Sequence, residues 1–304
     1  MIIYLAGGIS GNCFPLWRQL LSAINRGGQD LKLYLAGTQG RRWCVDAYLF
    51  GRGQKLKYEF VSCGGNALAG DGDISAEDEG DPPNILESFY YADEWTIKTI
   101  PLLKNFMLDS GAFTFFTLGK EVNWNQYIDR YIKFINENKV NKYFELDIDK
   151  LVGYPKVLEF RKELERQCPV SPIPVWHKSR GKNDFLSMCE KYNYVAIGGI
   201  VSKEITPKDY VYFPWFINEA HKRKAKIHGL GFTNLEGMRK YHFDSVDSTA
   251  WTTGNRFGAV YRFNGRTMVK YSRPEGTRLA DAKEVAINNF NEWVKFQKYA
   301  EGHL

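Results

Sequence analysis

Short apolar runs recur along the chain, and each is followed by a longer polar segment whose apolar residues have helical spacing. The runs are rich in β-branched and aromatic residues and end at Gly, Asp or another turn former, which is typical of β-strands. Several carry apolar side chains at successive positions, as strands of a parallel sheet covered on both faces do. The predicted strands are residues 2–6, 31–36, 56–62, 106–109, 143–148, 173–176, 194–197, 226–230 and 245–247.

Segments whose apolar residues have helical spacing lie between these runs and indicate the fold class. The predicted helices are residues 16–25, 124–138, 155–166, 184–192, 207–223, 234–241 and 280–299. Alternation of strand and helix predicts an α/β fold, and the spacing favours a (β/α)8 barrel of the TIM type over a doubly wound sheet. We expect one barrel domain over residues 1–304 with a C-terminal helix. Residues 64–84 are Gly-rich and acidic and end in Pro82-Pro83, so we expect a flexible insertion there.

Composition narrows the class of protein. The chain has 304 residues, 44% of them hydrophobic, and a net charge of +6 although six acidic residues fall within residues 66–84. The remaining chain is therefore basic, which permits a polyanionic partner. No run approaches about 20 apolar residues and no signal peptide is evident, so we expect no membrane association. The five cysteines are far apart without a C-x-x-C pair, which favours inert thiols in a reducing compartment, the cytoplasm.

Polar side chains stand where predicted strands end, and in a barrel all such ends open on one face. Asp109 and Ser110 follow the strand at 106–109, although Asp109 alone could equally cap a helix. Glu145, Asp147 and Asp149 alternate with apolar residues, which predicts that they share one face. Because three carboxylates on one face repel, at least one should be neutral, metal-bound or outside the strand. Pairing of Glu145 and Asp147 with cations such as Lys142 is the alternative.

Two further strand ends offer a flat platform and another pair of acids. Gly198 and Gly199 expose backbone groups before Ile200, which suits a planar base, whereas a tight turn would explain one of the glycines. Asp244 and Asp247 have D-x-x-D spacing, which also occurs in capping turns. His177 or His228 could join the carboxylates at a metal, but no HExxH or two-histidine, one-carboxylate spacing is present, so we expect a metal-free site without a cofactor. Phosphate-loop, nucleophile-elbow and dinucleotide motifs are also lacking.

Taken in order, these segments resemble the tRNA-guanine transglycosylase superfamily, including its bacterial and phage relatives that insert 7-deazaguanines into DNA. LDSGAF at 108–113 resembles the family's DSGGF, DIDKLVGYP at 147–155 its Asp followed by Tyr-Pro, and AIGGIVSKE at 196–204 its AIGGLAVGE. HGLGFTNLEGM at 228–238 and DSVDSTAWTTGNRFG at 244–258 resemble its MGVG and DMFDCVMPTRNARNG segments. The resemblance covers residues 105–260 and leaves the first 100 residues unmatched.

The resemblance assigns roles residue by residue. Asp247 takes the place of the nucleophile and Asp109 that of the acid and base acting on the departing and incoming bases. Asp149 recognises the base edge, and Gly198, Gly199 and Ile200 hold the 7-deazapurine. Ser110, Phe113 and His177 complete the substrate site, with His177 near the family's base-recognising glutamine. Arg256 matches an arginine that contacts the polynucleotide, and the other basic candidates are Lys178, Arg180, Arg262, Arg266 and Arg273, with Trp176 or Trp251 for stacking.

Differences from the family pattern favour DNA over tRNA as the substrate. The tRNA enzymes carry a zinc site of three cysteines and a histidine after the position of Gly258, whereas this chain has no cysteine after Cys189, and Thr253 replaces an arginine. The resemblance thus implies replacement of guanine in flipped or single-stranded DNA by a free 7-deazaguanine such as preQ0, through a covalent aspartyl-sugar intermediate. It also allows a homodimer and, for a phage-encoded member, the host cytoplasm. The alternatives are a zinc-independent tRNA-guanine transglycosylase, a non-catalytic nucleic-acid-binding barrel and, disfavoured by the AIGG platform, a glycoside hydrolase.

Overall fold

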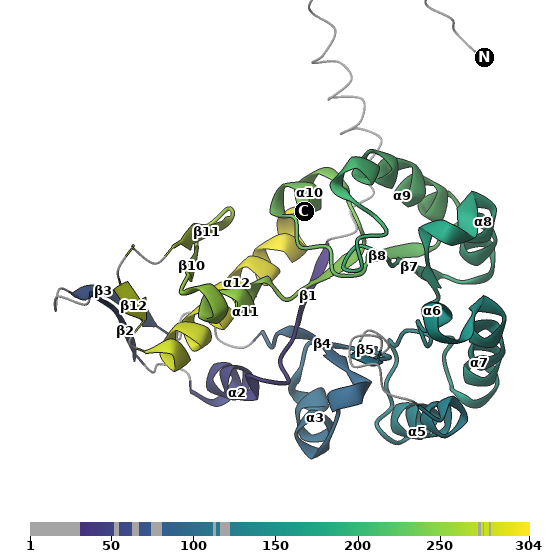
Figure 1. Ribbon diagram of the computed structural model, residues 1–304, viewed down its shortest axis with the longest axis horizontal. Coiled ribbons are helices and arrows are strands. Elements are labelled where there is room, and N and C mark those ends of the chain that lie inside the picture. The colour runs from purple at the N-terminus through teal and green to yellow at the C-terminus, as the bar shows by residue number, and fades with distance from the viewer. Residues whose placement is uncertain are drawn as a thin grey trace, which may run out of the picture.

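A parallel seven-stranded sheet, curled into a half-barrel, forms the centre of the molecule (Figure 1). The computed structural model describes residues 31–51, 55–62, 67–73, 81–111, 114–115, 122–272, 275, 277–279 and 281–304. The strand order is β5-β4-β1-β9-β8-β7-β6. The strands are β1 (Lys32–Ala36), β4 (Asn84–Ser88), β5 (Asn105–Asp109), β6 (Val175–Trp176), β7 (Tyr194–Ile197), β8 (Lys226–Gly229) and β9 (Ser245–Ser248). The strand predicted at 2–6 and the helix at 16–25 lie outside the described residues.

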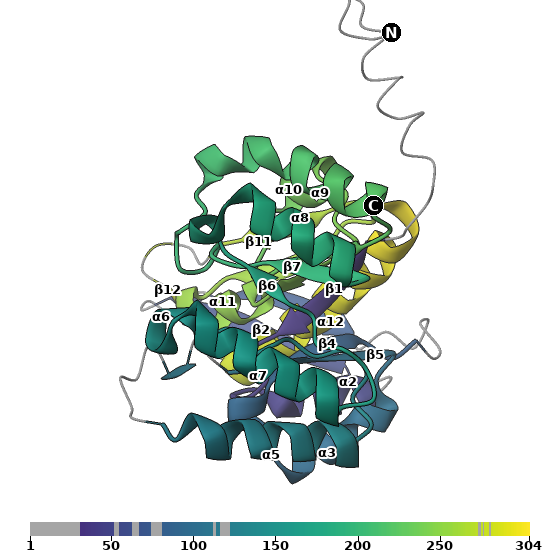
Figure 2. The ribbon, with the colours of Figure 1, turned by 90° about the vertical axis from the view of Figure 1, so that its right-hand side faces the viewer.

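Helices cover the outer side of this sheet. Figures 1 and 2 show them following one another around its curve. They are α3 (Glu94–Thr99), α5 (Trp124–Glu137), α6 (Asp149–Val152), α7 (Tyr154–Gln167), α8 (Gly181–Lys191), α9 (Phe213–Lys222) and α10 (Leu235–Lys240). Short 3-10 turns η1 (Phe89–Tyr91), η2 (Ile100–Leu102), η3 (Lys178–Arg180) and η4 (Pro207–Tyr212) join them to the strands. Among the helices that the structure describes, none combines the length and apolar character needed to cross a bilayer.

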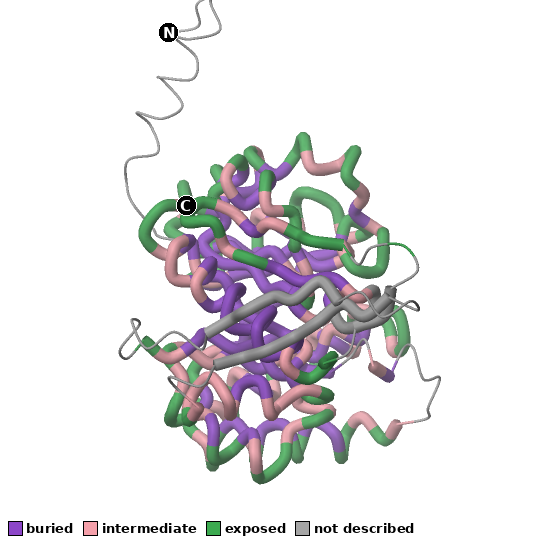
Figure 3. The backbone as a smooth tube through the Cα atoms, turned by 90° about the vertical axis from the view of Figure 1, so that its left-hand side faces the viewer, coloured by how far each residue is buried: buried purple, intermediate pink, exposed green. Residues whose placement is uncertain are grey.

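Strand alternation places two apolar layers on the sheet. Leu33 and Leu35 of β1 pack in a large cluster with the surrounding helices, whereas Tyr34 and Ala36 belong to a smaller cluster with side chains of β4, β5, β6 and β7. This period-2 division is what a parallel sheet covered on both faces requires. The tube view accordingly shows the middle of the molecule as buried, while the outer helices alternate between buried and exposed residues (Figure 3).

The closed eight-stranded barrel expected from the sequence is not formed. Between β5 and β6, residues 143–144 make only isolated parallel bridges, Tyr143 to Leu108 and Phe144 to Ile173. Beyond these bridges, hydrogen bonds from side chains take the place of the backbone hydrogen bonds between strands. The Val175 N–H donates to the Glu145 carboxylate over 2.8 Å, and the Arg180 guanidinium donates to the Val175 carbonyl. The segment at residues 143–145, where an eighth strand was expected, is therefore a seam that polar side chains connect to β6.

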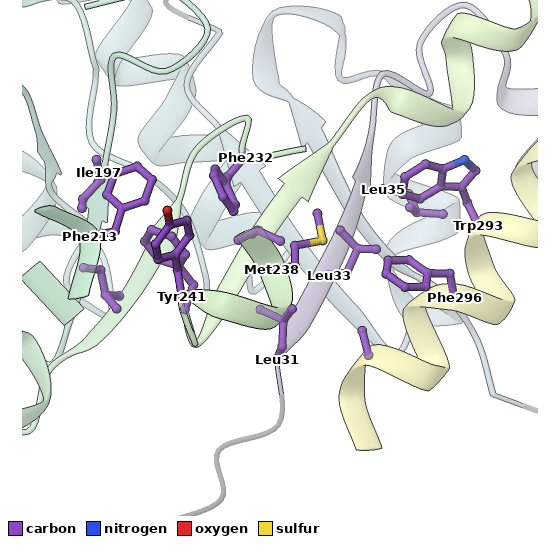
Figure 4. Close-up of a cluster of buried hydrophobic side chains, with 14 of the residues drawn as sticks. Leu31, Leu33, Leu35, Ile197, Phe213, Phe232, Met238, Tyr241, Trp293 and Phe296 are labelled. Atoms are coloured by element: carbon purple, nitrogen blue, oxygen red, sulfur yellow. The ribbon is translucent and has the colours of Figure 1, made fainter. Parts of the chain in front are cut away.

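The long helix α12 (Ala282–His303) confirms the predicted C-terminal helix and supports the sheet from one side. Figure 4 shows Leu33 and Leu35 of β1 beside Phe296 and Trp293 of this helix. Its Gln297 is 2% exposed and binds two strands at once. The amide donates to the carbonyls of Leu33 and Asn84, and its oxygen accepts the Asn84 N–H. Helix α12 thus fixes β1 to β4 by hydrogen bonds as well as by apolar packing.

Several segments differ from the sequence prediction. The run at 56–62 is not a barrel strand, because β2 (Lys55–Ser62) lies in an antiparallel sheet with β3 (Ala67–Asp73) and β12 (Thr277–Leu279). Strand β3 falls inside the flexible insertion expected at 64–84, of which residues 64–66 and 74–80 lie outside the described part. Strand β4 and the following elements were not predicted: α2 (Arg42–Phe50), α11 (Ala250–Phe257), and the hairpin β10 (Val260–Phe263) with β11 (Met268–Tyr271).

The seam provides a stability test, because Arg161 neutralises the fully buried Glu145 through contacts of 2.5 and 3.0 Å. Arg161→Met leaves this carboxylate buried without its nearest partner, and we expect a loss of roughly 3–5 kcal/mol in the free energy of unfolding. The double variant Glu145→Gln, Arg161→Met should lose less, because position 145 then carries no charge and the buried Arg180 keeps its partner Asp149. Urea unfolding followed by circular dichroism measures both. A single variant within about 1 kcal/mol of the wild type would contradict this assignment.

Candidate functional site

The carboxyl ends of the sheet strands form a mouth in which several acidic side chains converge. Strand pairing places Ser88 opposite Asp109 and Tyr34 opposite Asp247, so both aspartates lie on the inner side of the curled sheet. The negative charges of Asp147 and Asp247 contribute to the raised pKa of Asp109. These three side chains, which come from segments far apart in the sequence, therefore lie near one another. The sequence-based expectation that Asp109 and Asp247 meet at one face is consistent with this geometry.

Asp109 is held at the end of β5 by the turn that follows it. Its Oδ2 accepts the Gly111 N–H over 2.9 Å, and Gly111 has a φ of +82°, which favours glycine. A Cβ there would lie 2.8 Å from Tyr90 and 3.0 Å from the Ser88 hydroxyl. Burial, followed by the charges of Asp147 and Asp247, raises the pKa of Asp109 to about 6. This carboxyl can therefore both give and take a proton near neutral pH.

Ser110, which belongs to this turn, is buried and does not face solvent. It is 1% exposed, its carbonyl accepts the Tyr127 hydroxyl over 2.6 Å, and its Oγ lies 3.5 Å from the Asp147 N–H. Phe113, the other substrate-site residue predicted here, lies outside the described residues.

Asp247 is fixed at the end of β9 by a backbone donor and a histidine. Its Oδ1 accepts the Gly231 N–H over 2.6 Å and lies 3.3 Å from the His228 Nε2. The other ring nitrogen of His228 is 2.5 Å from the Ser245 Oγ, so the imidazole is oriented from both ends. Asp247 is 7% exposed. This arrangement presents a carboxylate of fixed orientation.

His177, which follows β6, lies between two carboxylates. Its Nε2 is 2.7 Å from Asp147 and its Nδ1 is 3.2 Å from Glu204. Burial disfavours the charged ring, but the hydrogen bond and charge of Asp147, with the charge of Asp149, outweigh it and raise the pKa of His177 to about 9. The imidazolium therefore donates from both nitrogens at neutral pH.

The three alternating carboxylates do not share one face, which corrects the sequence expectation. Strand character ends at Phe144, so the period-2 alternation does not continue to the later residues. Glu145 points to Arg161 of α7, Asp147 to His177, and Asp149 begins α6 and accepts from Arg180 Nη2 over 3.1 Å. Each acid has its own cation, and the mutual repulsion is relieved.

The glycine platform is shaped by the protein itself. A Cβ on Gly198 would lie 2.9 Å from the His177 ring, and Gly199 has a φ of +84°. Ile200 is partly buried against the large apolar cluster. The pair of glycines is thus needed for the histidine and for the turn, and their contact with a flat base stays a prediction.

The predicted cations and aromatic rings separate into core and surface groups. The Arg180 side chain is 4% exposed and lies 4.0 Å from the Tyr154 ring centroid, which indicates a structural role rather than a phosphate contact. Trp176 and Trp251 are buried, and the Trp251 Nε1 donates to the Ala36 carbonyl, so neither offers a free stacking face.

Lys178 is exposed and forms an ion pair with Asp209 over 2.7 Å. Arg262 and Arg266 are exposed on the β10–β11 hairpin. Nothing is described of the Arg256 side chain or of Arg273.

One group of side chains has the composition of a metal site. One ligand atom each of Asp147, Asp149 and His177 lies within 4.8 Å of the others, beside a hollow of about 630 Å³ lined in part by Glu204 and Lys150. A cation would need a ring nitrogen without its proton and release of Asp149 from Arg180. The hydrogen-bonded imidazolium fits the present arrangement better than a metal ligand does.

Sequence reasoning missed Glu204. This acid follows the glycine pair by five residues and returns to the mouth because the Ile205 N–H donates to the Gly199 carbonyl over 3.0 Å. Strand alternation cannot place a carboxylate inside a loop, so the only available signal was an acidic residue shortly after Gly-Gly. His228 was considered only as a metal ligand, and its contact with Asp247 was not anticipated.

Comparison of the chain with models of known protein families and with curated proteins finds no match.

The charged state of His177 predicts a pH dependence of stability. Because the folded-state pKa of about 9 exceeds the ordinary 6.5, the stabilisation is complete below pH 6.5 and is lost as pH rises through about 9. A shift of this size corresponds to roughly 3 kcal/mol. We expect His177→Gln to lose this part of the pH dependence, measured by urea unfolding between pH 6 and 10. His303→Gln, at an exposed position on α12, is the matched control. The same slope in wild type and His177→Gln would refute the assignment.

Proposed function

We propose that the protein exchanges guanine in DNA for a free 7-deazaguanine, using Asp247 as nucleophile and Asp109 as acid and base. The observation that carries the proposal is the pairing of unlike carboxyls in one mouth. Asp247 is oriented by a backbone N–H and a histidine, while Asp109 has a pKa of about 6. A carboxylate that is held in place and a second carboxyl that can give and take a proton are what a double displacement at a sugar carbon requires.

The first half of the reaction breaks the bond between guanine and the sugar. An Asp247 oxygen attacks C1′, the electron pair of the glycosidic bond passes to guanine, and the Asp109 proton moves to the departing base. The carboxylate also stabilises positive charge that develops on the sugar before the new bond is complete. The products are free guanine, an ester between Asp247 and C1′, and ionised Asp109.

The second half runs in the opposite direction with another base. Ionised Asp109 removes a proton from the incoming 7-deazaguanine, whose nitrogen attacks C1′ and displaces the Asp247 carboxylate. Both carboxyls return to their starting states, so atoms and charge balance without an external cofactor. A stacked base cannot reach the mouth, and the target nucleotide must be flipped out or single-stranded.

Asp149 supplies a polar group for the edge of the base, and the His177 imidazolium, held between Asp147 and Glu204, lies beside it. Asp149 borders the hollow beside the mouth and is bound to Arg180 in the present arrangement. Guanine presents N–H donors that a carboxylate accepts. DNA is favoured over tRNA because the chain has no cysteine after Cys189 with which to build the zinc site of the tRNA enzymes.

Incorporation of radiolabelled guanine into duplex DNA, single-stranded DNA and unmodified tRNA tests the reaction directly. We expect label in DNA. Asp247→Asn should reduce incorporation by at least about 10³-fold because the amide is a poor nucleophile. The matched control is Asp244→Asn, since Asp244 bonds His221 and the Ile227 N–H away from the mouth. Full exchange by Asp247→Asn would refute the nucleophile, and label in tRNA alone would reassign the polymer.

Asp109 predicts a pH profile. Departure of guanine needs protonated Asp109, so kcat/KM for the polynucleotide should fall as pH rises through about 6. Asp109→Asn should lower exchange about 10²–10⁴-fold and remove this limb from the profile. A limb that persists near pH 6 in the variant would belong to another group and contradict the role of Asp109.

Asp149 predicts a change in selectivity. Asp149→Ala removes an acceptor for the base edge, and we expect the preference for guanine over adenine as the incoming base to fall at least tenfold. Asp184→Ala, an acid of α8 that bonds the Tyr154 hydroxyl instead, serves as control. Competition between labelled purines measures the ratio, and an unchanged ratio would exclude Asp149 from base recognition.

A further inference from the structure

A second, larger hollow lies at the amino-terminal edge of the sheet, opposite the mouth. Its volume is about 940 Å³, and its lining includes the first residues of β7 and β8, Tyr194 and Lys226, together with Lys142 and Lys224. The acidic residues Asp109, Glu204 and Asp247 follow the other ends of the strands. Nothing in the proposed base exchange uses this edge.

The hollow is basic, and of its four lining lysines only Lys191 has an acidic partner among the described residues. Among the described residues, no carboxylate lies within ion-pair distance of Lys142, Lys224, Lys226 or the neighbouring Lys32. Lys142 donates instead to the neutral Asn105 side chain over 2.6 Å.

The nearby carboxylates already have other partners. Glu301 pairs with Lys104 over 2.8 Å, Asp244 with His221 over 2.9 Å, and Glu165 with Lys191, a further lysine of the lining. An excess of positive charge therefore remains in the hollow.

The lysines repel one another. Burial, followed by the charges of Lys32 and Lys226, lowers the pKa of Lys142 to about 8. An anion in the hollow would remove the repulsion among the ammonium groups.

We propose that this hollow binds a small phosphorylated ligand, with Lys142, Lys224 and Lys226 contacting its phosphate oxygens. Ammonium groups on flexible stems are common phosphate ligands, and three of them around one hollow suit a ligand with more than one phosphate. Tyr192 and Tyr194 in the same lining provide aromatic surface beside the charges. A polynucleotide seated at the mouth would meet the opposite edge of the sheet, which favours a small ligand here.

Isothermal titration calorimetry of the full chain with sodium tripolyphosphate, at constant ionic strength set with NaCl, tests the site. We expect saturable binding of one tripolyphosphate per chain. The double variant Lys142→Gln, Lys226→Gln should weaken binding at least tenfold, and Lys226→Gln alone, at an exposed position, gives a second reading with little risk to folding. Lys162→Gln, an exposed lysine of α7, is the matched control.

The outcomes separate this site from other sources of binding. Loss of affinity in the hollow variants with retention in Lys162→Gln supports the proposal. Absence of saturable binding overturns it. An equal loss in Lys162→Gln also overturns it, in favour of general attraction of the anion to a basic surface. A single-stranded oligonucleotide that binds more tightly than tripolyphosphate and weakens in the same variants also overturns the assignment to a small ligand. Guanine exchange is measured in parallel and should be retained in Lys226→Gln, so the two proposals can fail separately.

Discussion

The position of the buried Glu145 carboxylate determines how the mouth is built. It bonds Arg161 of α7 and the Val175 N–H of β6, so it connects the sheet, an outer helix and the segment that replaces the eighth strand. A buried charge in this place is tolerated because hydrogen bonds surround it. With the ladder ended there, the chain turns outward and delivers Asp147 and Asp149 to the mouth from a loop and a helix start rather than from a strand.

The acidic side chains of the mouth differ in the partners that they bind. Asp147 and Glu204 are balanced by the His177 imidazolium, and Asp149 by Arg180. Among the described residues Asp109 has no ion-pair partner, and this is why burial and neighbouring charges shift its pKa upward. Asp247 is held by the Gly231 N–H and by the His228 ring. The same fold therefore offers a carboxylate that stays in place and a carboxyl that can exchange a proton.

Much of the fold follows from the sequence, because apolar runs of β-branched residues can be buried only in a covered sheet. The runs that became β1, β5, β6, β7, β8 and β9 were predicted, as was the helix α12. The run at 56–62 was counted among these strands although Lys57 and Glu59 alternate with apolar residues, a period-2 pattern that is typical of antiparallel strands. Strand β4 was missed since its short run Asn84–Ser88 follows directly on the prolines of the acidic segment.

The site was predictable where it depends on strand ends and not where it depends on side-chain partners. Asp109 and Asp247 end apolar runs, and the parallel sheet places both at the carboxyl ends of its strands. The burial of Arg180 depends on Glu145 and Tyr154, which no local pattern connects. Asn288, Asn289 and Asn291 of α12 are buried, and Asn289 bonds the backbone of Tyr261 and Ala259. Such pairings are decided by tertiary contacts.

The central claim is that Asp247 becomes bonded to the sugar, and trapping of that ester tests it most directly. The protein is incubated with end-labelled single-stranded DNA in the absence of free base, denatured, digested and mapped by mass spectrometry. The account predicts a DNA adduct on the peptide that contains Asp247, discharged by added guanine and missing from Asp247→Asn. Exchange of labelled guanine without an adduct, or with an adduct on another residue, would contradict it.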